Sequence, residues 1–375
     1  MKRVLLLVLA LLILTTSALA DTRIDGAKAR NITLHEVGLN EAPEGVSPTT
    51  GRTLADIEVP EGSAGLAATG RYMPMLVQID NAEGGMGYRA PWGARYADIV
   101  YESPLYLTSK SKHSVETRIS FLFSDILPDD VGPVRSARMG HAWLREEWDC
   151  GFVFYGQQTY EGTNVLGVFK QTGADQKGVL FSGIVGSANE WKKFFYKREQ
   201  LISPHDKGAN IAAMSELIPA EHVAPNHAFL FTDEIPQGKP AKKINVSWNM
   251  NGYNSQLVYD AAKGTYTRSM LSNKGKDLGL YVDFDTKEPL EFNNVIIQHT
   301  VTNWKRVDAP VTQVVGEGNA DYFIGGMRVP GYWKRADMSS RTVYYDLSGN
   351  EMAFARGRTL IVLLPLENTV SYAAE

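Results

Sequence analysis

The chain has one cysteine, Cys150, among its 375 residues. A single cysteine cannot form a disulfide within one chain, and it cannot supply a cysteine cluster for zinc. Its neighbour Phe152 and the apolar stretch around them favour a buried, unreactive thiol. The histidines also lack metal-ligand spacing, since Pro225 between His222 and His227 is incompatible with one helical face. The sequence therefore indicates no metal site, and it shows no cofactor motif.

The chain lacks an excess of charge of either sign, with 38 basic and 42 acidic residues. This balance does not favour bulk binding of nucleic acid or a polybasic membrane surface. Long hydrophobic runs are absent after the N-terminus, so we expect no transmembrane segment in the body of the chain.

The apolar run at residues 4–14 follows Lys2 and Arg3 and precedes Ala18-Leu19-Ala20. This order is typical of a secretory signal peptide with an A-x-A cleavage site. A retained membrane anchor is the alternative, but a bilayer core needs about 20 apolar residues. We therefore expect residues 1–20 to be removed, and the protein to be extracellular or associated with the cell envelope.

The remaining chain is long enough for two domains. Residues 21–70 have little apolar periodicity and predict a flexible linker. Residues 71–222 combine strand patterns with helical spacing at 137–148, 190–198 and 209–217, which predicts an α/β domain. Residues 223–368 contain many short strand patterns, which predict a mostly antiparallel β domain. The predicted fold class is α+β, an N-terminal α/β domain followed by a mostly antiparallel β domain.

Ten short stretches are distinctive: 78–81, 97–102, 117–118, 132–138, 203–206, 266–268, 294–298, 316–318, 331–334 and 357–362. The run Gly132-Pro-Val-Arg-Ser-Ala-Arg138 is the most specific of them. In these stretches the chain resembles the YerB-like lipoproteins, two-domain bacterial envelope proteins of unknown function. The resemblance implies export, two domains and an envelope location, but no activity. The family's usual lipobox cysteine is absent, because Asp21 follows Ala20.

Arg135 and Arg138 form the leading candidate site. They follow a Gly-Pro turn and precede a predicted helix that Ser136 could cap. Two guanidinium groups at a helix start, with free backbone N–H groups, would suit a carboxylate or a phosphodiester. Internal pairing with acidic residues of the same domain is the alternative.

Four acidic residues surround the first strands: Asp80, Asp98, Glu102 and Glu116. The first three are the expected internal partners if the arginines have a structural role. Two carboxylates at a suitable separation could instead perform glycoside hydrolysis. Asp80 precedes Asn81 at a strand end, where capping of a turn is common.

His205 follows Pro204 in a predicted loop, where it could act as a general base or bind an anion. A hydrogen bond to the backbone is the alternative. Our candidate catalytic residues are Glu102 and His205. Our candidate ligand-binding residues are Asp80, Asn81, Arg118, Arg135, Ser136 and Arg138.

Aromatic residues cluster in two places and could form platforms for sugar rings or pack in the core. They are Tyr88, Trp92 and Tyr96, and then Tyr322, Phe323, Tyr332 and Trp333. Three functions remain open. The first is a non-catalytic module that binds a wall polymer through the arginines and neighbouring aromatics. The second is a hydrolase or transferase acting on a wall glycopolymer, and the third is a protein-interaction subunit of an envelope complex.

Overall fold

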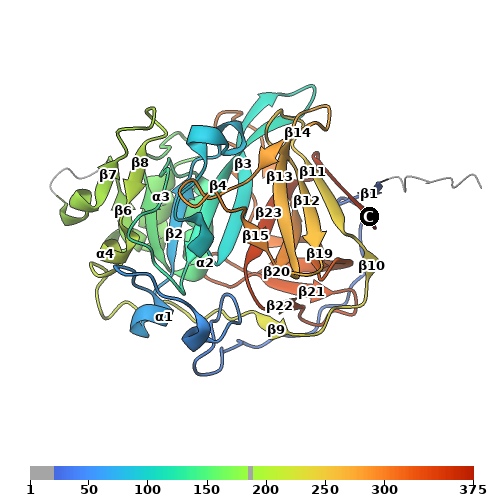
Figure 1. Cartoon of the computed structure of the whole chain (residues 1–375), viewed down its shortest axis with the longest axis horizontal. Helices are drawn as coiled ribbons and strands as arrows, with labels where there is room; N and C mark the ends of the chain where they lie inside the picture. The colour runs from blue at the N-terminus through green and yellow to red at the C-terminus, as the bar shows by residue number, and fades with distance from the viewer. Residues whose placement is uncertain (1–20, 185–188) are drawn as a thin grey trace, which may run out of the picture.

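The computed structural model describes residues 21–184 and 189–375, so the predicted signal peptide lies outside the described residues. Strands dominate these residues (Figure 1). The described α-helices are α1 (Leu66–Thr69), α2 (Met139–Trp148), α3 (Val165–Thr172) and α4 (Ile211–Ser215). The described 3-10 helices are η1 (Leu54–Asp56), η2 (Ala82–Gly84), η3 (Gly87–Arg89), η4 (Ala94–Tyr96), η5 (Ala174–Gln176) and η6 (Glu190–Phe194).

The predicted α+β class, with an N-terminal α/β domain, is wrong because the protein is mostly β. The helical spacing at 190–198 corresponds only to η6, followed directly by β7 (Phe195–Lys197). The spacing at 209–217 corresponds to the five residues of α4, preceded by β8 (Lys207–Ala209). Periodicity alone cannot separate a short apolar helix from a buried strand, and this ambiguity caused the error.

A sheet of 11 strands forms the centre of the protein, in the order β10-β20-β19-β16-β23-β3-β4-β2-β5-β6, with β21 paired to β20. Its earlier strands are β2 (Met75–Ile79), β3 (Ile99–Ser109), β4 (Ser114–Phe123), β5 (Gly151–Phe154) and β6 (Leu180–Ser182). Its later strands are β10 (Lys239–Pro240), β16 (Asn294–Thr300), β19 (Gly316–Ile324), β20 (Met327–Arg335), β21 (Val343–Asp346) and β23 (Thr359–Pro365).

A second sheet has 7 strands, in the order β1-β24-β11-β12-β13-β14, with β15 paired to β13. These strands are β1 (Thr22–Ile24), β11 (Lys243–Ser247), β12 (Asn254–Asp260), β13 (Thr265–Leu271), β14 (Asp277–Leu280), β15 (Glu291–Phe292) and β24 (Thr369–Ala373). The described two-stranded pairs are β7 with β8, β9 (Leu230–Thr232) with β22 (Ala353–Ala355), and β17 (Thr302–Asn303) with β18 (Val311–Thr312).

The parallel pairing of β3 with β23 joins strands from distant parts of the chain into one sheet. The register runs from Ile99 opposite Thr359 to Glu102 opposite Val362. Every residue of β23 is buried, as expected for a central strand covered on both faces. The large sheet therefore continues from strands before residue 222 to strands after it, while the predicted domain limits remain predictions.

The core lies on both faces of the large sheet. Alternation along the strands sends neighbouring residues to opposite faces. One face carries Val77, Val100 and Phe121 and packs with Ile244, Leu257 and Tyr266 of the second sheet. The other face carries Leu76, Tyr101 and Leu122 and packs with Leu144 and Trp148 of α2 and Phe169 of α3. The large sheet is therefore the middle layer, with the second sheet on one side and α2 and α3 on the other.

Residues 21–70, predicted as a flexible linker, make specific contacts with both sheets. β1 pairs with β24, and Ala64 forms a bridge with Leu127. Arg30 Nη2 lies 2.9 Å from the buried carboxylate of Asp321. Hydrogen bonds and an ion pair, not a periodic apolar face, hold this segment, so its sequence carries little periodic signal.

Cys150 is buried, as predicted, and burial raises the pKa of its thiol to about 12. Within residues 21–184 and 189–375, no helix has both the length and the apolar character needed to cross a membrane.

Ile361→Ala tests whether the large sheet unfolds as one unit. Ile361 lies opposite Tyr101 across the β3–β23 pairing and is fully buried. Its truncation should lower the free energy of unfolding by about 2–5 kcal/mol. We expect one transition at lower denaturant, seen equally by tryptophan fluorescence and circular dichroism. Ile235→Ala, at a position 64% exposed, is the matched control. Two transitions with only one of them shifted would contradict this expectation.

Candidate functional site

Strand pairing places Asp80 between two arginines. Ile79, the last residue of β2, pairs with β4 and also forms a bridge with Val134. Arg118 therefore lies on one side of Asp80, and Arg135 lies on the other. Arg118 Nη1 is 3.3 Å from Asp80 Oδ1, and Arg135 Nε is 3.6 Å from the same oxygen.

His205 reaches Asp80 from the loop before β8. The loop returns to this place because the backbone N–H of Val134 donates to the carbonyl of Lys207 at 2.7 Å. His205 Nδ1 hydrogen-bonds Asp80 Oδ2, and its ring meets the edge of Tyr88 at a centroid distance of 6.1 Å. Within the described residues, His205 Nε2 makes no hydrogen bond, and the side chain is 12% exposed.

The carboxyl group of Asp80 is strongly acidic. Burial alone would raise its pKa, but the hydrogen bond from His205 and the charges of Arg118 and Arg135 outweigh burial. The pKa of Asp80 is lowered to about 2. Asp80 is therefore ionised at neutral pH and accepts a hydrogen bond from the Nδ1–H group of His205.

Arg138 is the third guanidinium of the cluster. Nη2 donates to the hydroxyl of Tyr106 at 3.0 Å, and Nη1 donates to the carbonyl of Ala137 at 3.1 Å. No carboxylate in the described part of the chain forms an ion pair with Arg138, and Asp308 acts on it only from a longer distance. We call Asp80, Arg118, Arg135, Arg138 and His205 the arginine cluster.

The arginine cluster holds unused donors and excess positive charge. Arg118 and Arg138 are 3% and 6% exposed, and the Nε atoms of Arg118, Arg135 and Arg138 lack a hydrogen-bond partner. The pKa of Arg118 is lowered to about 10, mainly by burial. The charge of Asp80 opposes this shift, and the charges of Arg138 and Arg135 add to it. Asp80 therefore lies at ion-pair distance from two of the three guanidinium groups, and Arg138 has no carboxylate at that distance within the described residues.

The start of α2 differs from our expectation for Ser136. The helix begins at Met139 with Arg138 as its N-cap residue. Ser136 Oγ instead donates to the carbonyl of Tyr155 at 3.2 Å, so the predicted cap is wrong. The backbone N–H of Arg138 donates to His141 Nδ1 at 3.1 Å, so an aromatic nitrogen performs the capping role.

His141 and Ser103 are in hydrogen-bond contact, but they do not form a nucleophile–base pair. His141 Nδ1 accepts from the backbone, so Nε2 carries the proton and donates to Ser103 Oγ at 2.9 Å. Burial, followed by the charge of Arg138, lowers the pKa of His141 well below its usual value. A nitrogen that already holds a proton cannot remove another from Ser103.

Glu102 is fully buried, and the protein occupies both of its oxygens. Oε1 accepts from Thr117 Oγ1 at 2.8 Å, and Oε2 lies 2.8 Å from Arg268 Nη2. Asn81 joins the same chain because its Nδ2 donates to Thr117 Oγ1 at 2.7 Å. Arg268 was missed in the sequence, although the alternating pattern of β13 places it on the buried face.

The four acidic residues singled out in the sequence lie in different surroundings. Asp80 and Glu102 each pair with arginines, as described above. Glu116 is half-buried, and burial raises its pKa. Asp98 accepts a hydrogen bond at 3.0 Å from the backbone N–H of Asp125, an acidic neighbour that we did not single out.

Most of the candidate aromatic platforms belong to the core. Trp92, Tyr322, Phe323 and Trp333 are buried. Tyr88, by contrast, is 39% exposed beside His205. No group of three His, Cys, Asp or Glu side chains within residues 21–184 and 189–375 is placed to hold a metal ion.

The described residues thus form a mostly-β protein with two large sheets, and the arginine cluster lies where β2, β4 and the loop before β8 meet. Two family models match the chain, the N-terminal and C-terminal domains of "Protein of unknown function (DUF3048)", over residues 63–224 and 244–361. The chain belongs to this two-domain family, and the resemblance to the YerB-like proteins is confirmed.

A solved relative supports the fold. The crystal structure of YerB protein from Bacillus subtilis matches with a TM-score of 0.63 and 21% sequence identity, covering 87% of this chain and 99% of that chain. At this identity the likeness concerns the fold alone. No curated protein matches the chain.

Asp80 makes stability depend on acid pH. A carboxylate whose pKa is lower in the folded state than in the unfolded chain stabilises the folded state at pH values above its unfolded pKa. This contribution is lost as the pH falls through the folded pKa. Between about pH 5 and pH 2, wild type should lose about 2 kcal/mol more than Asp80→Asn. Urea unfolding at several pH values measures this difference. Asp129→Asn, which removes an exposed carboxylate, should follow wild type. Parallel pH profiles for wild type and Asp80→Asn would contradict the assignment.

Proposed function

We propose that this protein is an exported, non-catalytic module of the cell envelope that binds an anionic wall polymer at the arginine cluster. The observation that carries the proposal is the imbalance of three guanidinium groups against one carboxylate at ion-pair distance. The signal-like leader supports export.

Unused donors on buried cations favour an anionic ligand. A buried charge without a partner raises the free energy of the folded state, and pairing with an anion would recover that cost. Carboxylates and phosphodiesters present paired oxygens that suit guanidinium groups. The buried Nε atoms of Arg118 and Arg138 make no hydrogen bond, and Arg135 Nε lies 3.6 Å from Asp80 without forming one.

Access to the cluster is from the side of Arg135 and His205. Their side chains are 25% and 12% exposed, whereas Arg118 and Asp80 lie beneath them. Tyr88 lies beside His205 and offers a partly exposed ring against which a sugar could pack. A polymer with sugar rings and anionic groups matches this combination.

Arg138→Met separates a binding role from a structural role. Removing a buried cation that is surrounded by like charge should raise the free energy of unfolding by about 1 kcal/mol. The same change should weaken polymer binding. Urea unfolding and binding to purified wall sacculi are the two measurements. A loss of stability of several kcal/mol would instead support a purely structural arginine.

Arg135→Ala tests the exposed member of the cluster. We expect at least a tenfold loss in the amount of protein that pellets with sacculi, because one charge-assisted contact with the polymer disappears. Arg23→Ala removes one exposed arginine from β1 and is the matched control. Wild-type binding should also fall as salt increases, since salt screens the exposed part of the cluster. Equal pelleting of Arg135→Ala and wild type would contradict the site.

A hydrolase or transferase acting on the wall glycopolymer is the second candidate, favoured by the contact between His205 and Asp80. Asp80 orients the imidazole and leaves Nε2 as a possible base. Glu102 has both oxygens held within the protein, so we assign the base role in this candidate to His205. Release of soluble wall fragments by wild type, and its loss in His205→Gln, would replace the binding proposal with this one.

A further inference from the structure

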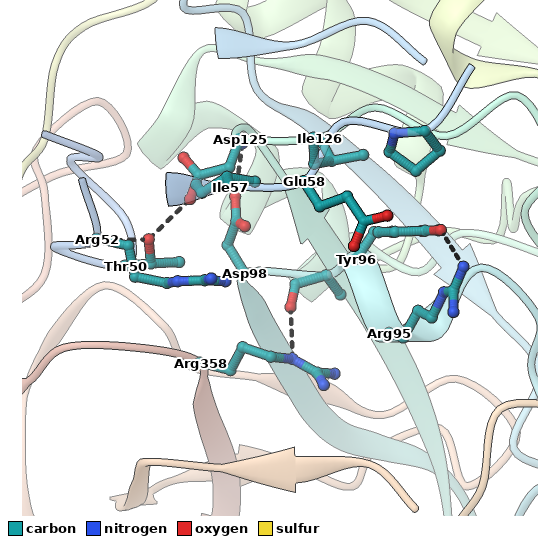
Figure 2. Close-up of a pocket in the computed structure, with 12 residues that line it drawn as sticks. Thr50, Arg52, Ile57, Glu58, Arg95, Tyr96, Asp98, Asp125, Ile126 and Arg358 are labelled. Atoms are coloured by element: carbon teal, nitrogen blue, oxygen red, sulfur yellow. Dashed lines mark hydrogen bonds between the residues drawn. The ribbon is translucent and has the colours of Figure 1, made fainter. Parts of the chain in front are cut away.

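A separate cavity of about 370 Å³ lies at the start of β3 (Figure 2). Its walls come from residues 50–60, 95–98 and 125–126, together with Arg358 from the segment before β23. Four distant parts of the chain therefore meet around one space. Its volume is within the range of small-molecule sites, about 300–1,000 Å³.

Two carboxylates without a cation form one wall of the cavity. Asp98 Oδ2 accepts from the backbone N–H and the hydroxyl of Ser124, at 2.6 and 2.8 Å. Asp125 Oδ2 accepts from Thr50 Oγ1 at 2.7 Å, whereas its buried Oδ1 has no hydrogen bond. Asp125 is 3% exposed, and neither carboxylate forms an ion pair within the described residues. Figure 2 shows both side chains on the same side of the cavity.

The two carboxyl groups compete for ionisation. Burial and the charge of Asp125 raise the pKa of Asp98 to about 8, although hydrogen bonds from Ser124 and Asp125 oppose this. Burial also raises the pKa of Asp125, against the opposing charge of Arg52. The other titratable groups around the pair include the hydroxyl of Tyr72, the guanidinium of Arg358 and the exposed carboxylate of Glu58, which also lines the cavity. The pair therefore retains a proton near neutral pH.

A guanidinium without a carboxylate partner forms the opposite wall. Arg358 Nε donates to the carbonyl of Ala97 at 3.0 Å, and Nη2 donates to the carbonyl of Ala94 at 3.0 Å. These carbonyls orient the side chain, and Asp98, Asp283 and Glu291 act on its charge from beyond ion-pair distance. Arg52 and Arg95 add exposed positive charge at the rim (Figure 2).

We propose that this cavity binds a small zwitterion of the α-amino acid type, with its ammonium group on Asp98 and Asp125 and its carboxylate on Arg358. The two walls present opposite charges, each lacking a partner of its own at ion-pair distance. Ile57, Pro60 and Ile126 line the remaining surface and offer apolar contact to a side chain.

Ligands that carry charge of only one sign fit the same walls poorly. A divalent cation on the carboxylates would face Arg52 and Arg358, whose charges act on this pair. A simple anion on Arg358 would face Asp98. A zwitterion satisfies both walls, and its ammonium group displaces the proton retained by the carboxylates, which leaves to buffer.

The test is isothermal titration calorimetry of the purified protein with each common L-amino acid and with D-alanine. We expect at least one of them to bind and to release up to about one proton per ligand near pH 7, seen as a dependence of the heat on the buffer. For the tightest ligand, the amine without the carboxylate and the acid without the amine should each bind at least tenfold more weakly. Absence of binding across the panel up to roughly 10 mM ligand, or equal binding of either truncated ligand, would overturn the proposal.

Asp125→Asn keeps the shape of the site and should weaken amino-acid binding at least tenfold. The control Asp129→Asn should leave this binding unchanged. If Asp125→Asn fails to fold by circular dichroism, Arg358→Gln replaces it and should weaken amino-acid binding at least tenfold, because it removes the charge proposed to hold the ligand carboxylate. Unchanged binding in the folded variant would overturn the proposal. The arginine cluster is a separate site, so Arg138→Met should keep amino-acid binding and Asp125→Asn should keep sacculus binding.

Discussion

The parallel pairing of β3 with β23 is the contact on which the rest of the structure depends. It places Thr359 opposite Ile99, and the backbone N–H of Thr359 donates to the carbonyl of Asp98 at 3.0 Å. Arg358 and Asp98 therefore come to the same cavity from positions about 260 residues apart in the chain. The same pairing makes β3 a central strand, so that Glu102 is removed from water and requires a partner. That partner is Arg268, supplied by the second sheet.

Buried charge explains the arrangement of the polar residues better than catalysis does. Glu102 is compensated by Arg268 and Thr117, and this closed set contributes to the contact between the two sheets. The arginine cluster is different, because Asp80 alone lies at ion-pair distance from its arginines. Protein interiors rarely leave charges uncompensated, and sites that do so commonly receive the missing charge from a ligand. The two sites at which we propose ligands each contain a buried charged group, Arg138 and Asp125, that lacks an ion-pair partner among the described residues.

Several features could be predicted from the sequence because they depend on local order. The motifs around Gly132–Pro133 and Asp98–Glu102 were sufficient to identify the family. The apolar surroundings of Cys150 indicated its burial. The candidate residues Asp80, Arg118, Arg135, Arg138 and His205 do meet in one cluster, although spacing alone could not supply their distances. Ser136 and the helices after residue 190 were predicted incorrectly, because short apolar runs and caps are decided by the elements that pack on them.

The sequence by itself determined the family and the positions of several strands, and it singled out the residues of the arginine cluster, since these depend on composition and short-range pattern. Only the tertiary structure decided that most of the chain is β and that residues 21–70 contact both sheets. It also decided which acidic residue faces which cation, because a strand's neighbours are chosen by pairing between distant segments. Arg268, Asp125 and Arg358 show the reason, because each contacts a partner more than 20 residues away in the chain. Such contacts cannot be predicted from a local sequence pattern.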